Sequence, residues 1–144
     1  MRMHAAAPLL LLLLVTACGG GLSKSELVAK GDAICKRVNT RMAKEPDPKT
    51  TADLQRLAKR TVELSDPAID DMEALEPPSE LEDDFKKFVA SLKRQRDLTK
   101  ELGDAAGKDD TAKIQEIGTK AQKQQDEYRR LTGRIGFKEC GGGV

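Results

Sequence analysis

Apolar residues recur at spacings of three and four in four separate runs of the chain, and this periodicity is the strongest constraint on its fold. The runs extend from Leu27 to Met42, from Leu54 to Leu75, from Leu81 to Ala106 and from Ile114 to Ile135. Aromatic residues, which favour strands, are sparse, with three Phe, one Tyr and no Trp. The pattern therefore predicts four amphipathic helices.

Local signals mark where these helices begin. Ser23 and Glu26 form a capping-box pattern ahead of the first run, and Ser79 and Glu82 repeat it ahead of the third. The second helix is expected to begin at Thr50 or Thr51, and Asp109 or Asp110 is expected to cap the fourth.

Prolines and glycines mark the ends. Pro46 and Pro48 are expected to stop the first helix near Lys44, and the pair Pro77-Pro78 ends the second. Gly107 is expected to end the third helix, while Gly133 and Gly136 let the chain turn after the fourth.

Pro67 is the one proline placed inside a periodic run. A proline there removes a helical hydrogen bond and crowds the preceding turn, which predicts a kink or a short break near residues 63–66.

Four helices with short connections fold most simply as an up-down-up-down bundle, so the sequence predicts an all-α four-helix bundle. One alternative stays open. Gln124 and Gln125 place polar groups in the fourth apolar run, which also fits a long helical hairpin completed by a partner chain.

Residues 1–17 have the composition of a signal peptide, with a basic start at Arg2 and an apolar run from Ala5 to Val15. The run is too short for a transmembrane helix, which needs about 20 residues. The segment Val15-Thr16-Ala17-Cys18 resembles the lipobox of bacterial lipoproteins. This resemblance implies cleavage before Cys18, a diacylglyceryl thioether on its sulfur and acylation of its amino group. The protein would then be anchored on the extracytoplasmic face of the cell membrane.

The expected organisation has three parts: a lipoprotein signal peptide at 1–17, the lipidated cysteine with a glycine tether at 18–22, and a helical bundle domain at 23–144. Five residues of tether span at most about 17 Å, so the domain is expected to sit against the membrane.

Two cysteines remain once Cys18 carries lipid. In an oxidising compartment an isolated pair in a small domain is most simply a disulfide, so Cys35 is predicted to bond Cys140. In an up-down-up-down bundle the fourth helix ends beside the start of the first, which lets the tail fold back along the first helix. A redox-active pair is disfavoured because no Cys-x-x-Cys motif is present.

Several loose motifs occur together in this order: the lipobox, a glycine tether, Ala33-Ile34-Cys35, the Pro-Pro pair, and a final segment from Gly136 to Gly141. This arrangement is similar to a group of small secreted helical lipoproteins of high-GC Gram-positive bacteria. The resemblance implies the helical architecture, and no activity is assigned to that group.

Enzyme activity is not expected. The only histidine, His4, lies in the leader, so the mature chain lacks the usual base for a serine or cysteine nucleophile. No cofactor fingerprint or Cys/His metal spacing is present. Four serines of the domain are expected to be helix caps or surface residues: Ser23, Ser65, Ser79 and Ser91.

The charge composition does not indicate a particular binding partner. The chain has 25 basic and 24 acidic residues, and no strong field is available to attract nucleic acid. Acidic clusters at residues 66–73 and 80–84 could offer oxygens to calcium, but they lack EF-hand spacing. Basic residues from Lys86 to Lys100 could meet anionic lipid, although acidic residues are interleaved.

Two functions are compatible with these features. The first is a non-enzymatic, lipid-anchored module that binds another envelope protein or organises the cell surface, with Leu64 and Val89 as candidate exposed apolar contacts. The alternative is a carrier that binds an apolar small molecule between its helices, which a buried cavity would favour.

Overall fold

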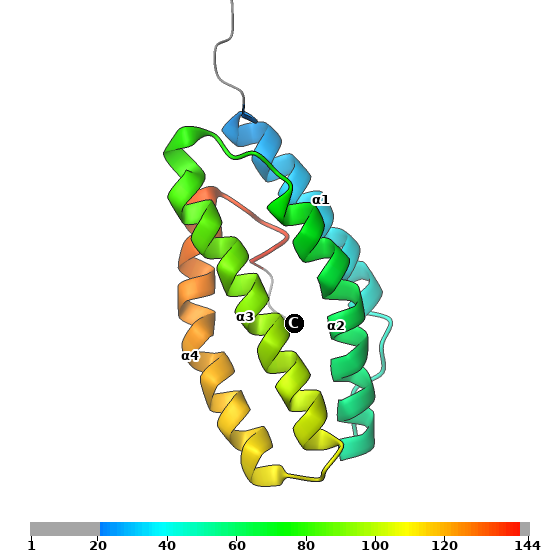
Figure 1. Ribbon diagram of the computed structural model, residues 1–144. Coiled ribbons are helices and arrows are strands. Elements are labelled where there is room, and N and C mark those ends of the chain that lie inside the picture. Colours follow the sequence, from blue (N-terminus) through cyan, green and yellow to red (C-terminus); the bar gives the residue numbers. More distant parts are fainter. Residues whose placement is uncertain (1–20, 142–144) are drawn as a thin grey trace, which may run out of the picture.

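The computed structural model describes residues 21–141 and folds them into four helices with no strand in that range. These are α1 (Lys24–Met42), α2 (Thr51–Glu73), α3 (Glu82–Ala106) and α4 (Thr111–Ile135). Consecutive helices run antiparallel, which confirms the predicted up-down-up-down bundle (Figure 1). Within residues 21–141, none of the helices combines the length and the hydropathy needed to cross a bilayer.

The capping box predicted for α1 is confirmed. The backbone N–H of Glu26 donates to Ser23 Oγ at 3.3 Å, and the backbone N–H of Ser23 donates to the Glu26 carboxylate at 2.8 Å. Thr50 and Asp53 form a second box at the start of α2, and Asp110 caps α4 by accepting from the backbone of Lys113 at 3.0 Å. These contacts satisfy backbone donors that the first helical turn leaves without partners.

The capping box predicted at Ser79 was wrong. Residues Ser79–Leu81 form a 3₁₀ turn, and α3 begins at Glu82 with no side-chain cap. A capping serine must lie in an extended conformation just outside the helix, and here that position belongs to Pro78, whose ψ is 152°.

Of the kink or short break predicted near Pro67, the break does not occur, because α2 is continuous from Thr51 to Glu73. Pro67 is exposed, while its neighbours Leu64 and Ala68 are buried. Packing of the buried side holds the helix together although the proline supplies no backbone N–H.

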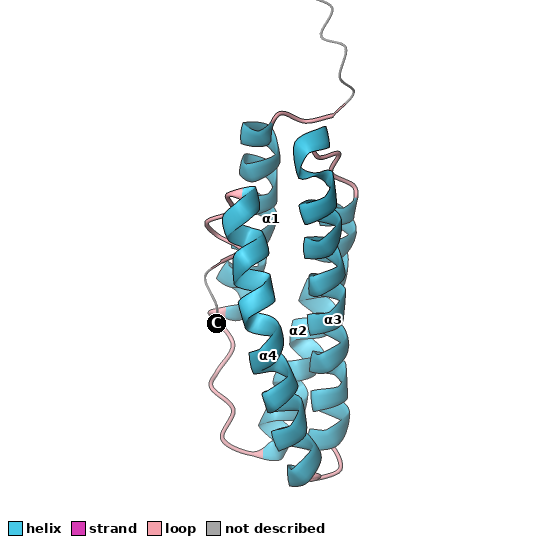
Figure 2. Ribbon diagram, turned by 90° about the vertical axis from the view of Figure 1, so that its left-hand side faces the viewer, coloured by secondary structure: helices cyan, strands magenta, loops and turns pink. Residues whose placement is uncertain are grey.

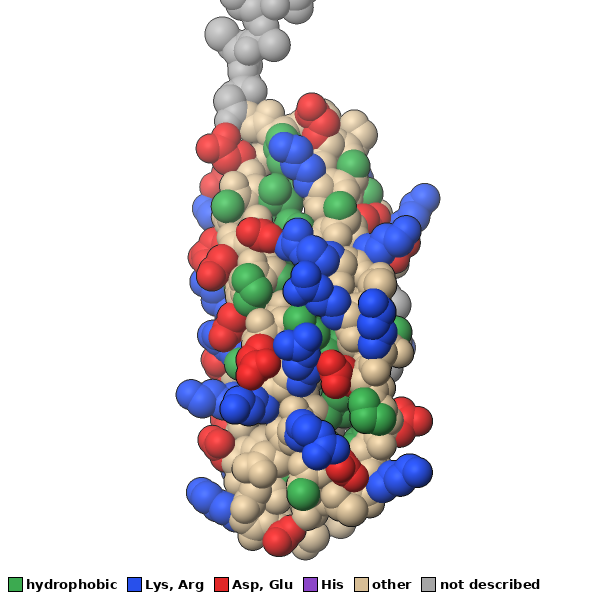
Figure 3. All heavy atoms as spheres, turned by 90° about the vertical axis from the view of Figure 1, so that its right-hand side faces the viewer, with side chains coloured by type: hydrophobic (Ala, Val, Ile, Leu, Met, Phe, Trp, Pro, Cys, Tyr) green, Lys and Arg blue, Asp and Glu red, His purple; other side chains and the backbone are tan. Residues whose placement is uncertain are grey.

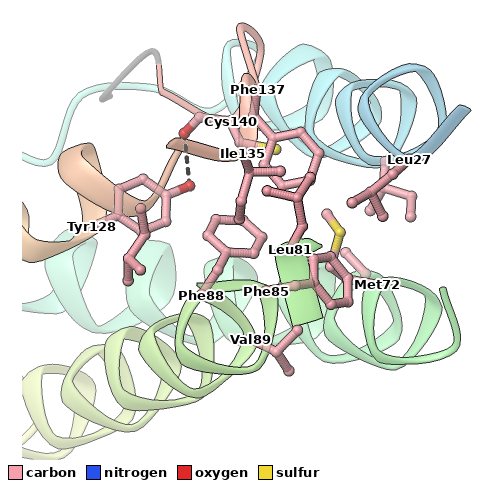
Figure 4. Close-up of a cluster of buried hydrophobic side chains, with 13 residues drawn as sticks. Leu27, Met72, Leu81, Phe85, Phe88, Val89, Tyr128, Ile135, Phe137 and Cys140 are labelled. Carbon is pink, nitrogen blue, oxygen red and sulfur yellow. Dashed lines mark hydrogen bonds between the residues drawn. The ribbon is translucent and has the colours of Figure 1, made fainter. Parts of the chain in front are cut away.

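The aromatic part of the core lies where α3, α4 and the C-terminal tail meet (Figure 4). The ring of Phe88 is its centre, with ring centroids 5.6 Å from Tyr128, 5.1 Å from Phe137 and 6.3 Å from Phe85. Leu27 of α1 and Met72 of α2 close this cluster from the other side.

Helix α1 is the short member of the bundle, with 19 residues against 25 in both α3 and α4. Residues 43–50 then run without regular structure to the far end of the bundle, where α2 begins (Figure 2). Ala121 of α4 is exposed. The interior of the bundle is covered by four helices at one end and by fewer at the other.

The C-terminal tail, residues 136–141, fills the space between α4 and α1. Gly136 ends α4 with a positive φ of 99°, whereas Gly133, also expected to turn the chain, lies inside the helix. Both Lys138 and Glu139 donate their backbone N–H to Asp32 Oδ1 at 2.9 Å. These bonds fasten the tail along α1.

The segment before α1 is also fixed to the bundle, by a backbone hydrogen bond to the loop after α2. The backbone N–H of Leu22 donates to the carbonyl of Glu76 at 2.9 Å. The start of the described chain is thus held against the loop between α2 and α3.

Candidate ligand-binding cavity

A cavity of about 580 Å³, partly open to solvent, lies between the helices, next to the tail. All four helices and Cys140 contribute to its lining. The apolar part of the wall consists of Ile34, Val38, Ala68, Ile69, Met72 and Leu92. Small-molecule sites in proteins have this character, with volumes of about 300–1,000 Å³ and mainly apolar walls.

Hydroxyl groups line the cavity without offering free protons. Thr61 Oγ1 donates to the carbonyl of Leu57 and Thr99 Oγ1 to that of Gln95, both at 2.9 Å. Ser65 Oγ donates to the Val62 carbonyl at 3.1 Å. Each of these oxygens keeps lone pairs that can accept a hydrogen bond from a ligand.

Gln95 differs from these residues. Its Nε2 is buried and has no hydrogen-bond partner within the described part of the chain. Since an amide nitrogen is a donor, Gln95 offers the cavity a hydrogen bond that the protein itself does not use.

Tyr128 closes the cavity beside the tail. Its hydroxyl donates to the carbonyl oxygen of Cys140 at 2.6 Å (Figure 4). Burial raises the pKa of Tyr128 to about 12, so the side chain remains a neutral phenol at physiological pH.

The predicted disulfide is present, with Cys35 of α1 bonded to Cys140 of the tail and their Cα atoms 5.1 Å apart. Both cysteines line the cavity, so the bond forms part of its wall as well as fastening the tail. Cys18, the predicted lipidation site, lies outside the described residues.

A larger groove of about 980 Å³ runs along the exterior between α2 and α3. Its lining carries both signs of charge, including Lys59 and Lys100 on one hand and Glu63 and Asp104 on the other. Arg96 separates the groove from the cavity and is paired with Asp66 at 2.6 Å and with Asp97 at 2.7 Å. Its hydrogen bonds, first to Asp66 and then to Asp97, raise the pKa of this guanidinium. With charges of both signs, the groove selects no particular ligand.

The basic residues of α3 are largely neutralised by acidic neighbours. Lys93 contacts Glu73 at 2.8 Å and Arg94 contacts Glu127 at 3.2 Å. Basic and acidic side chains are also intermixed on the face that presents α1 and α2 (Figure 3). In residues 21–141, no group of three or more His, Cys, Asp or Glu side chains is arranged to hold a metal ion.

Three sequence interpretations need correction. Leu64 and Val89, proposed as exposed apolar contacts, are only 6% and 7% exposed. Ser91, interpreted as a cap or surface residue, is 1% exposed. Ser91 and Gln95 lie three and seven residues after Phe88, on the helix face that carries the core. That spacing could have predicted that the side chains of Ser91 and Gln95 face the core.

Comparison with protein-family models, with curated proteins and with solved structures finds no match to this chain. The fold and the cavity define the protein structurally as a small, disulfide-bonded helical bundle with a half-open cavity between its helices.

Proposed function

We propose that the protein is a lipid-anchored, non-enzymatic carrier at the cell envelope that binds a small, largely apolar molecule between its helices. The observation that carries this proposal is the cavity lined by all four helices. A half-open pocket of about 580 Å³ with mainly apolar walls has the size and the lining of a small-molecule site.

The composition of the cavity wall supports binding over catalysis. Its hydroxyl groups are occupied with backbone carbonyls, and the one buried phenol is held neutral. None of these groups is arranged as a nucleophile beside a base. Apolar walls with a few fixed polar groups orient a ligand without transforming it.

The lipobox at residues 15–18 supports the envelope location. The short distance between Cys18 and the anchored Leu22 would hold the cavity close to the lipid bilayer, where apolar molecules concentrate. The alternative of a protein-binding module loses its candidate contacts, since Leu64 and Val89 are buried.

The test is to purify the full-length protein from membranes, extract it with organic solvent and identify the recovered molecules by mass spectrometry. A Thr61→Phe variant fills the cavity from α2. Thr119→Phe is its matched control, because Thr119 is exposed on α4 and loses the same kind of bond, from its hydroxyl to the carbonyl four residues earlier.

We expect one narrow class of compound in the wild type and in Thr119→Phe, and at least about tenfold less of it in Thr61→Phe, equivalent to 1.4 kcal/mol of binding free energy. Circular dichroism must show all three proteins folded. The same mixture of bulk lipids from all three would contradict the carrier function.

A further inference from the structure

Three buried side-chain atoms have no hydrogen-bond partner among the described residues: Ser91 Oγ, Gln95 Nε2 and Gln124 Oε1. Buried polar atoms in native proteins are nearly always paired with protein or with bound molecules. Leaving one unpaired costs about 1–3 kcal/mol. An unpaired set next to a cavity therefore points to a group that binds there.

The three atoms belong to one level of the bundle. Gln95 follows Ser91 by one helical turn on α3. The stacked rings of Phe88 and Tyr128 and the ion pair of Arg94 with Glu127 fix the register of α3 against α4. In that antiparallel register Gln124, one turn before Tyr128, lies opposite Gln95.

This polar level adjoins the cavity. Gln95 lines the cavity, as does Gln125, the neighbour of Gln124, whereas Ser91 and Gln124 lie behind the wall. The three unpaired atoms are covered by neighbouring atoms, so a ligand reaches them when the side chain of Gln95 rotates. The level offers an amide donor at Gln95, an amide acceptor at Gln124 and a hydroxyl at Ser91 that can act as either.

The chemistry of the level favours an uncharged partner. The buried polar residues of the described chain are Ser91 and Thr132, and neither carries a charge. An ionised group would lose its hydration at this level, while Arg96 on the cavity wall is already paired with Asp66 and Asp97, and Arg129 is exposed to solvent. A hydroxyl or carboxamide can both accept from Gln95 and donate to Gln124.

We infer that the carried molecule is a neutral amphiphile whose hydroxyl or carboxamide group binds at Ser91, Gln95 and Gln124, while its hydrocarbon part lies against the apolar wall formed by Ile34, Ala68 and Met72. Gln95 is the specificity-determining residue of the site. This inference rests on the proposed carrier function and names its ligand class.

The test compares two probes of similar size, benzyl alcohol and toluene, which differ in one hydroxyl group. They are titrated into the full-length protein in phospholipid nanodiscs. The methyl resonances of Ile34 and Ile69, both on the cavity wall, report occupancy by nuclear magnetic resonance. The variant is Gln95→Leu, which keeps the size of the side chain and removes its donor. Gln122→Leu is the control, because Gln122 is exposed on α4.

In the wild type and in Gln122→Leu we expect benzyl alcohol to bind about tenfold more tightly than toluene, a difference of 1.4 kcal/mol. In Gln95→Leu the two probes should bind alike, with toluene affinity retained, which also shows that the variant is folded.

The test distinguishes a failure of the inferred ligand class from a failure of the carrier function. Equal affinities for the two probes in the wild type, or a preference unchanged in Gln95→Leu, would overturn the assignment of Gln95 while leaving the carrier function intact. An ionised molecule recovered from the purified protein would overturn the ligand class alone. If neither probe shifts the Ile34 and Ile69 methyls and Thr61→Phe changes nothing in the extracts, then water alone occupies the cavity and both proposals fall.

Discussion

The ring of Phe137 occupies the space that a side chain at residue 31 would need, since a Cβ built on Gly31 overlaps the Cε1 and Cζ atoms of the ring. The absence of a side chain at Gly31 lets the tail pack directly on the backbone of α1. Glycine has a poor helical propensity, about 1 kcal/mol worse than alanine. At residue 31 this loss is offset by the packing of the Phe137 ring against α1.

Replacing Gly31 by Ala should therefore destabilise the protein by about 1–3 kcal/mol through overpacking. Gly118→Ala is the matched control, because nothing lies within 4 Å of a Cβ placed there. On α4 that change should stabilise by up to about 1 kcal/mol through helical propensity alone. Denaturant unfolding of both variants measures the two effects, and a stabilised Gly31→Ala would mean that the tail does not pack as described.

The disulfide between Cys35 and Cys140 spans 105 residues of chain. Replacing both cysteines by Ala should lower the free energy of unfolding by up to about 4.7 kcal/mol on the chain-entropy model. Thermal unfolding of the variant, compared with the oxidised and reduced wild type, measures the loss. If the double variant matches the oxidised protein in stability, the bond contributes nothing to the fold.

Ser23 and Ser79 both precede helices, but only Ser23 receives a helical backbone N–H on its side chain. Ser23→Ala should cost about 1 kcal/mol, in the ordinary range for a lost N-cap. Ser79→Ala should be nearly neutral. Equilibrium unfolding in urea tests the contrast, and equal losses from the two substitutions would contradict the different starts of α1 and α3.

Tyr128 provides a test in alkaline solution, because it is the only tyrosine and the chain has no tryptophan. Its folded pKa of about 12 lies above the unfolded value near 10. The stabilisation that this shift represents is complete below pH 10 and is lost as the pH rises from about 10 to 12.

Spectrophotometric titration of tyrosinate should therefore show a midpoint well above 10 in the folded protein and near 10 in the reduced, denatured chain. Chemical denaturation at rising pH should show the accompanying loss of stability. A folded midpoint near 10 would place Tyr128 in contact with solvent.

Local signals predicted much of the fold. The cap at Ser23, the end of α3 at Gly107 and the start of α4 at Asp110 depend on neighbouring residues alone, so the sequence displays them. The prediction of the Cys35–Cys140 bond needed the lipobox, which assigns Cys18 to lipid and the domain to an oxidising compartment, together with the bundle topology.

The interior could not be predicted in the same way. Whether Ser91 and Gln95 are buried depends on how α3 is rotated against α4, which a single helix does not encode. The break predicted at Pro67 failed for a related reason, since packing of the buried residues of α2 outweighs the local effect of the proline. The cavity arises from these long-range relationships.

The position of the disulfide also has a mechanical consequence. When the two ends of the chain are pulled apart, the covalent loop from Cys35 to Cys140 takes the intervening residues out of the load path. Tension applied at Leu22 can unfold only residues 22–35, which include the first part of α1 and span about 50 Å when extended, before it reaches the disulfide. Helices α2, α3 and α4, together with the greater part of the cavity wall, lie within the protected loop. A protein tethered by its N-terminus would thus extend by this short segment under shear force and would then resist further unfolding.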